Sequence, residues 1–240
     1  MHLLKLIIIV GLGAYLRLTL VPSSVEEQRT LEVIPLPVKS VSVQREEGAA
    51  VDCFVEDVEF PVYHREELKF GEYTAPLCLG NHQGVAVFAI LYPTHSFPSI
   101  ISQVCKCGKR PELLCVDLHF NAGPIHGPMV LTNTSGKDVG FSIVRELQCS
   151  YCSNGFCVCD RPYMVDTSRQ HSLGYLRHGN NANVASVIVE PFCMSDPELG
   201  QKAAAWSMTD EGVDAVAESY LRAIATSPYR VVVFTVGHYG

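Results

Sequence analysis

One segment carries four of the chain's ten cysteines within eleven residues. It reads Cys149-Ser-Tyr-Cys-Ser-Asn-Gly-Phe-Cys-Val-Cys159 and contains Asn154-Gly155 at its centre. Asn-Gly is the strongest two-residue hairpin signal, and in that register Cys152 lies opposite Cys157. Such a non-hydrogen-bonded pair has Cα atoms about 4.5 Å apart, at the short end of disulfide geometry. The segment therefore predicts a β-hairpin closed by a Cys152–Cys157 disulfide.

Zinc is the alternative for this segment, because four thiolates can form a closed tetrahedral site. The hairpin register opposes it, since alternation along a strand points Cys149 away from Cys152. A second alternative is a cytosolic protein whose metal sites share one histidine and five cysteines. These are His119, Cys105, Cys107, Cys115, Cys149 and Cys152. We expect neither a metal nor a cofactor.

An even number of cysteines is typical of a fully bridged secreted chain. We expect the remaining cysteines to form disulfides, although spacing implies no particular pairing. They are Cys53, Cys78, Cys105, Cys107, Cys115, Cys149, Cys159 and Cys193.

The N-terminus also indicates a protein that enters the secretory route. A basic residue, Lys5, precedes an apolar run from Leu6 to Leu16, which is typical of a signal peptide. Asn133-Thr-Ser135 is an N-glycosylation sequon. We therefore expect a secreted protein or one of the ER or Golgi lumen, with a type II membrane anchor as the alternative for residues 1–23.

Charge excludes two kinds of partner. The net charge is −7, and no run of Lys or Arg occurs. A nucleic-acid footprint is absent, as is a polybasic patch for membranes. We expect an unidentified protein or small ligand as partner, no nucleic acid, and membrane contact only through an uncleaved N-terminal segment.

Short apolar runs separated by turn residues predict strands over much of the chain. The expected fold class is α+β: a predominantly antiparallel β domain stapled by disulfides, with a smaller C-terminal α/β part. The domains would be a leader (1–23), a linker or edge segment (24–50), a Cys-rich β domain (51–165) and an α/β region (166–240). The expected strands of the β domain are Val51–Phe60, Gly84–Tyr92, Leu113–Phe120, Met129–Thr132 and Val139–Val144.

The C-terminal region predicts a strand, a helix and a strand. Val184–Val189 and Arg230–Val236 are β-rich runs, and Ser207–Ser227 has one apolar face at helical spacing. Thr209 is placed to cap this helix. Together they indicate one βαβ crossover.

The sequence offers only weak catalytic and binding candidates. His238 follows the last strand, where α/β sheets bind ligands. A polar stretch over 176–183 predicts a binding loop with Arg177, His178, Asn180 and Asn181 as candidates. No nucleophile elbow or Walker motif is present.

The main functional expectation is a disulfide-bonded, glycosylated interaction or immune-type module that acts by protein or ligand binding. The alternatives are a luminal hydrolase or transferase with its site near the C-terminal strand ends, and a cytosolic zinc-binding protein or processed polyprotein fragment.

Overall fold

The structure is a computed structural model that describes residues 76–91, 96–119, 127–156, 164–192 and 199–236. Their strands are β1 (Leu77–His82), β2 (Val85–Leu91), β3 (Leu113–Leu118), β4 (Met129–Thr132), β5 (Met164–Asp166), β6 (Ala185–Glu190) and β7 (Val231–Val236). Their helices are α2 (Phe97–Val104), α3 (Lys137–Ser153), α4 (Gly174–Ala182), α5 (Gly200–Ser207) and α6 (Asp210–Ala225), with a 3-10 helix η2 at Arg110–Glu112.

The strands form one mixed sheet in the order β1-β2-β7-β3-β6-β4-β5. Its centre is parallel: β2, β7, β3 and β6 run in one direction. Strand β1 is antiparallel to β2, and β4, which pairs in parallel with β5, is antiparallel to β6. The carboxyl ends of four neighbouring strands therefore lie along one edge of the sheet.

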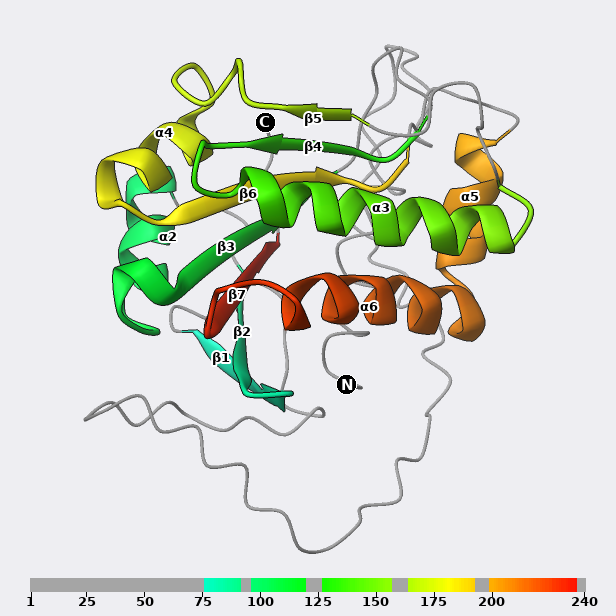
Figure 1. Cartoon of the computed structure of the whole chain (residues 1–240), viewed down its shortest axis with the longest axis horizontal. Coiled ribbons are helices and arrows are strands. Elements are labelled where there is room, and N and C mark those ends of the chain that lie inside the picture. Colours follow the sequence, from blue (N-terminus) through cyan, green and yellow to red (C-terminus); the bar gives the residue numbers. More distant parts are fainter. Residues whose placement is uncertain (1–75, 92–95, 120–126, 157–163, 193–198, 237–240) are drawn as a thin grey trace, which may run out of the picture.

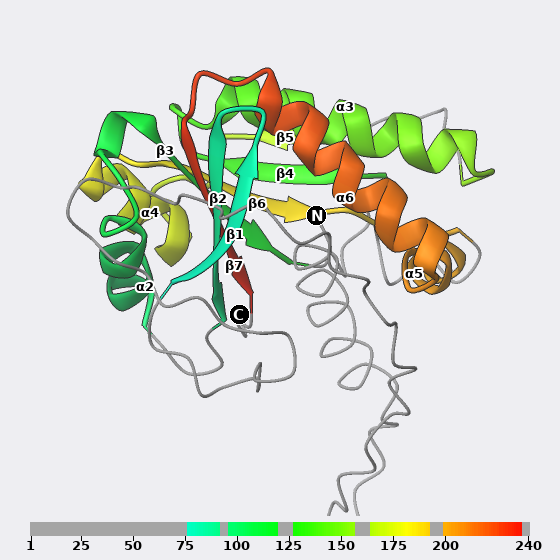
Figure 2. The ribbon, with the colours of Figure 1, turned by 90° about the horizontal axis from the view of Figure 1, so that it is seen from below.

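Helices cover both faces of this sheet (Figures 1 and 2). Helices α3 and α6 lie on one face, and α2 and α4 lie on the other. Alternate residues of a strand serve opposite faces. In β6, Val187 and Val189 belong to the core under α3 and α6, whereas Ile188 belongs to the core under α2 and α4.

The expected fold class is wrong. The described part of the chain is an α/β fold with a mixed sheet, not a predominantly antiparallel β domain. Strands from both sides of residue 165, the expected end of the Cys-rich β domain, share that sheet. The physical reason is visible in the apolar runs: strands buried on both faces lack polar alternation, which is typical of parallel sheets between helix layers.

Individual strands agree better with the sequence. Strands β2, β3 and β4 confirm the runs that begin at Gly84, Leu113 and Met129. The expected strand at Val139–Val144 is wrong, because these residues lie within α3. The leader, residues 24–50 and the expected strand Val51–Phe60 lie outside the described residues.

Helix α6 confirms the main helix expected from sequence. The Thr209 hydroxyl accepts a hydrogen bond from the Gly212 amide at 3.1 Å, which caps the helix. The strands that flank it, β6 and β7, are parallel as the crossover predicts. However, β3 lies between them, and α5 precedes α6 in the connection.

The Asn154-Gly155 hairpin is also wrong, because these residues end helix α3. The Phe156 amide donates to the Tyr151 carbonyl at 2.9 Å, and the Gly155 amide donates to the Cys152 carbonyl at 3.2 Å. Gly155 has φ of +84°, the left-handed conformation typical of a residue just past a helix end. Asn-Gly thus serves as a helix stop here.

The expected disulfide framework fails for most described cysteines. Five of them have free thiols: Cys105, Cys107, Cys115, Cys149 and Cys152. Cys152 lies within α3, and its Sγ is 3.2 Å from the side-chain nitrogen Nε2 of Gln148. The helix therefore holds Cys152 away from any hairpin partner. Cys157 lies outside the described residues.

None of the helices in the described ranges combines the length and apolarity needed to cross a bilayer.

Candidate acid-base site

Polar side chains collect at the carboxyl ends of three parallel strands. Asp117 and His119 come from the end of β3, Glu190 is the last residue of β6, and Thr235 lies near the end of β7. The register places Asp117 beside Thr235 on one side and Ile188 on the other. Because side chains alternate along each strand, all four point to the face that α2 and α4 cover.

His119 and Glu190 form the outer pair of this group. The His119 amide continues the ladder by donating to the Val189 carbonyl at 2.9 Å. The imidazole Nδ1 then lies 3.7 Å from Glu190 Oε1. The His119 side chain is 30% exposed and that of Glu190 is 9% exposed, so solvent reaches the pair from the histidine side.

Burial changes the chemistry of Glu190. It raises the pKa of this carboxyl from 4.5 to about 7, although the charge of Arg169 partly opposes the shift. Glu190 Oε2 is buried and has no hydrogen-bond partner among the described residues. A buried polar atom left in this state is uncommon and calls for an explanation, such as a water, an ion or a catalytic role.

A buried hydrogen-bond network lies behind this pair. The Thr235 hydroxyl donates to Asp117 Oδ1 at 2.7 Å, and the Tyr175 hydroxyl of α4 is 2.9 Å from Thr235 Oγ1. Tyr175 also bonds to Cys115. Burial raises the pKa of the Cys115 thiol well above its usual value, so this cysteine is a poor nucleophile.

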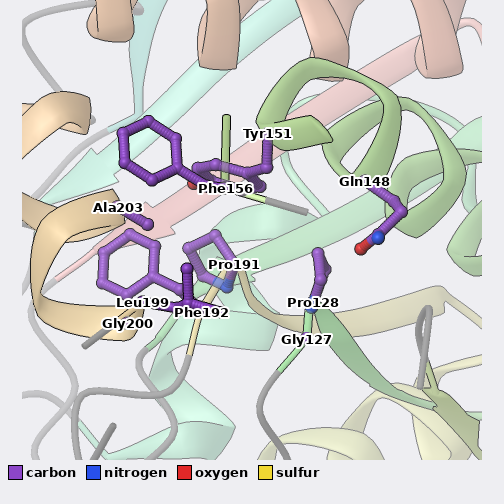
Figure 3. A pocket seen from close by; sticks show the side chains of 10 residues that line it. All are labelled: Gly127, Pro128, Gln148, Tyr151, Phe156, Pro191, Phe192, Leu199, Gly200 and Ala203. Carbon is purple, nitrogen blue, oxygen red and sulfur yellow. The ribbon is translucent and has the colours of Figure 1, made fainter. Parts of the chain in front are cut away.

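The chain just after Glu190 is held by aromatic packing (Figure 3). Pro191 and Phe192 line a small hollow with Tyr151 and Gln148, which both project from α3. The Phe192 and Tyr151 rings meet edge to face with centroids 6.2 Å apart. The free space is about 10 Å³, room for one water at most, so the hollow acts as support and not as a substrate pocket.

His119 and Glu190 are both side chains that can bind a metal ion. A protein site normally supplies at least three such ligands. Within the described ranges, no cluster of three or more His, Cys, Asp or Glu side chains is arranged to hold an ion. The expected shared site of His119 with the five cysteines is therefore not formed by these residues.

The candidates named from sequence lie elsewhere. His238 is outside the described residues and stays a prediction. The 176–183 stretch is not a loop: it belongs to α4, which ends at Ala182. Its C-terminal end leads into the amino end of β6, opposite the edge that carries Glu190. His178 and Asn181 line a groove there, whereas the Asn180 amide lies 3.4 Å from the Gln170 carbonyl.

Asn133 is unsuited to glycosylation because it is 1% exposed. Its Nδ2 donates to the Val184 carbonyl at 2.8 Å, and its Oδ1 accepts from the amides of Gly136 and Ser186, both at 3.0 Å. A glycan on Nδ2 cannot fit in the core. The expected glycoprotein is therefore wrong at its sequon.

Sequence reasoning missed Asp117 and Glu190 as site residues and considered His119 only as a metal ligand shared with cysteines. The signal was present, since Asp117-Leu-His119 and Glu190 end two apolar runs that were both expected as strands. Ligand sites of open α/β sheets lie at such carboxyl ends.

No known protein family matches the chain. No curated protein matches it either. Solved structures with a related arrangement include an N-acetylmuramoyl-L-alanine amidase from Clostridium difficile 630, at 15% identity and TM-score 0.33, covering 46% of this chain and 55% of that one. The amidase AmiC2 of Nostoc punctiforme has 19% identity and TM-score 0.31, with the same coverages. The amidase Ami1 of Mycobacterium abscessus has 16% identity and TM-score 0.35, covering 53% of this chain and 58% of that one.

The chain thus spans between 55% and 58% of the length of these three structures. By name they are hydrolases, the class that the sequence left as an alternative to binding, and none is a glycoprotein binding module. At these TM-scores the likeness assigns neither a substrate nor a role to any residue of this chain.

Proposed function

We propose that the protein is a hydrolase whose acid-base group is Glu190. The observation that carries the proposal is the carboxyl at the end of β6, with its pKa raised to about 7 and a buried, unpartnered Oε2. General acid-base catalysis is most effective when the catalytic pKa lies near the working pH. Perturbed carboxyls at strand ends are candidate functional groups on this ground.

In the proposed reaction, every proton transfer uses a group at this edge of the sheet. Glu190 takes a proton from a water molecule, whose oxygen then attacks the carbonyl carbon of the substrate. The neighbouring His119 imidazole donates a hydrogen bond to the oxyanion that forms. Glu190 returns its proton to the leaving group as the bond from the carbonyl carbon breaks. The nearby thiol, Cys115, is hydrogen-bonded and poorly ionised, which favours water as the nucleophile.

A panel of amides and esters tests which substrate class the protein hydrolyses. Amides come first, because the named activity of the structural neighbours is that of an amidase. The panel would contain N-acetylmuramoyl-L-alanine compounds, simpler N-acyl amino acids and esters. Since His119 and Glu190 are also metal-binding side chains, each assay would be run with and without added divalent ions.

The test replaces Glu190 by its neutral isostere. We expect Glu190→Gln to lower kcat by about 10²- to 10⁴-fold, the usual range for a lost acid-base group. In the parent protein kcat/KM should rise with pH and level off above about 7, because the base must be deprotonated. Glu211→Gln, at an exposed position of α6, is the control and should keep full activity. Unchanged activity of Glu190→Gln would refute the proposal.

The predicted leader would place such a hydrolase outside the cell or in a lumen. That part of the proposal rests on residues 1–23 alone and needs its own test, the N-terminal sequence of the mature protein.

A further inference from the structure

A concave site lies between helices α2 and α4, at the edge of the sheet opposite the acid-base site. It has a volume of about 350 Å³, within the range of small-molecule sites. We call it the α2/α4 groove. Its polar lining consists of Ser102, Cys105, Arg110, His178 and Asn181.

The groove is separate from the acid-base site. Arg110 precedes the amino end of β3, whereas His119 follows its carboxyl end. Six strand residues at about 3.3 Å each put the two sites about 20 Å apart. The groove therefore does not belong to the hydrolytic site.

The polar side chains of the groove take no part in the hydrogen bonds and ion pairs that hold the fold together. Among the described residues, the side chains of Ser102, Arg110, His178 and Asn181 make no hydrogen bond or ion pair with one another or with a neighbour. Cys105 is a free, half-buried thiol. All these side chains except the thiol can donate strong hydrogen bonds, and they come from both walls of one cavity.

The surrounding charge favours an anion. The segments around the groove, residues 105–112 and 174–183, contain four basic residues and one acid in a chain of net charge −7. The basic residues are Lys106, Lys109, Arg110 and Arg177, and the acid is Glu112. An arginine fork matches the two oxygens of a carboxylate or phosphate. Pro98, Ile101 and Ala182 complete the lining with apolar surface, which suits a carbon skeleton.

We infer that the α2/α4 groove binds a small organic anion, through a carboxylate or phosphate held by Arg110, His178 and Asn181. A carboxylate and a phosphate ester present the same oxygens to these donors, so the site is defined by that shared chemistry. The apolar wall selects an organic anion over an inorganic ion.

Cys105 supplies a built-in reporter for this test. The full-length protein would be alkylated with neutral iodoacetamide, and the rates at Cys105 and Cys149 followed separately by peptide mass spectrometry. Cys149 is exposed on α3, on the other face of the sheet, and serves as the internal reference. Succinate and O-phosphoserine are the probes, and neutral succinamide is the control ligand.

We expect succinate or O-phosphoserine to slow alkylation of Cys105 by about tenfold at ten times the dissociation constant, with Cys149 unaffected. The more protective probe identifies the preferred anion. Succinamide should not protect. Arg110→Gln should abolish protection, whereas Arg177→Gln, an equal charge change on α4 outside the lining, should keep most of it.

Absence of protection by both anions at millimolar concentration would overturn the inference. So would equal protection in Arg110→Gln, or equal losses in Arg110→Gln and Arg177→Gln, which would indicate a diffuse field without a site. Arg110 is exposed, and matching thermal midpoints would exclude a folding defect. None of these outcomes depends on hydrolytic activity.

Discussion

At the residue scale, the same physical effect gives Glu190 its chemistry and makes it costly to the fold. Burial favours the protonated carboxyl, so the folded chain holds this proton more tightly than the unfolded chain does. The titratable groups that face it are His119, at 3.7 Å, and Arg169. A residue kept at such a cost is more readily explained by catalysis than by stability.

This linkage predicts how stability depends on pH. Between pH 4.5 and about 7 the folded state binds more protons at Glu190, so its contribution to stability falls as pH rises and stays low above 7. Glu190→Gln removes that dependence. We expect the variant to gain roughly 1–3 kcal/mol of unfolding free energy relative to the parent over this window. Urea unfolding at pH 4.5 and 8 measures it, and Glu211→Gln should show no such change. A constant difference across the window would contradict the shift.

Asn133 provides a second prediction at this scale. Its amide joins the turn after β4 to the start of β6 through three buried hydrogen bonds. Asn133→Ala leaves the buried Ser186 amide without its Asn133 acceptor and removes one of two partners from both the Gly136 amide and the Val184 carbonyl, so we expect a loss of roughly 1–3 kcal/mol in chemical unfolding. Ser135→Ala removes the same sequon at an exposed side chain and should cost under about 0.5 kcal/mol. Similar losses in both variants would mean that the sequon carries the effect.

At the element scale, helix α3 shows why a local motif can mislead. Asn-Gly satisfies both a hairpin turn and a helix end, since each requires a residue with positive φ. The surrounding pattern decides between them. Val139, Ile143 and Leu147 recur every four residues and are all buried, whereas Phe141 is 42% exposed. A strand over Val139–Val144 would bury Phe141 on the same face as Val139 and Ile143.

The helix predicts a small effect for a cysteine replacement. In α3, Cys152 has a free thiol, and its Sγ accepts a hydrogen bond from the side-chain amide of Gln148. Cys152→Ser should therefore change the unfolding free energy by less than about 1 kcal/mol, because a hydroxyl can accept the same bond. The exposed Cys149→Ser is the matched control. A loss of about 2–4 kcal/mol under non-reducing conditions would instead indicate a native disulfide.

At the scale of the whole molecule, the sequence predicts where the strands lie along the chain better than which strands lie side by side in the sheet. The runs at β2, β3, β6 and β7 were readable, and so was α6 with its Thr209 cap. The insertion of β3 between β6 and β7 depends on packing between distant segments, which no local pattern specifies. That insertion also brings His119 beside Glu190. The site was therefore predictable in kind, as polar residues at strand ends, but not in its pairing.

In the proposed function, burial beside His119 tunes Glu190 as an acid-base group. The most direct measurement is an NMR titration of the glutamate side-chain carboxyl carbons, with the Glu190 signal assigned by its absence in Glu190→Gln. We predict a midpoint near pH 7 for Glu190. A midpoint near 4.5, the ordinary value for a glutamate, would contradict it.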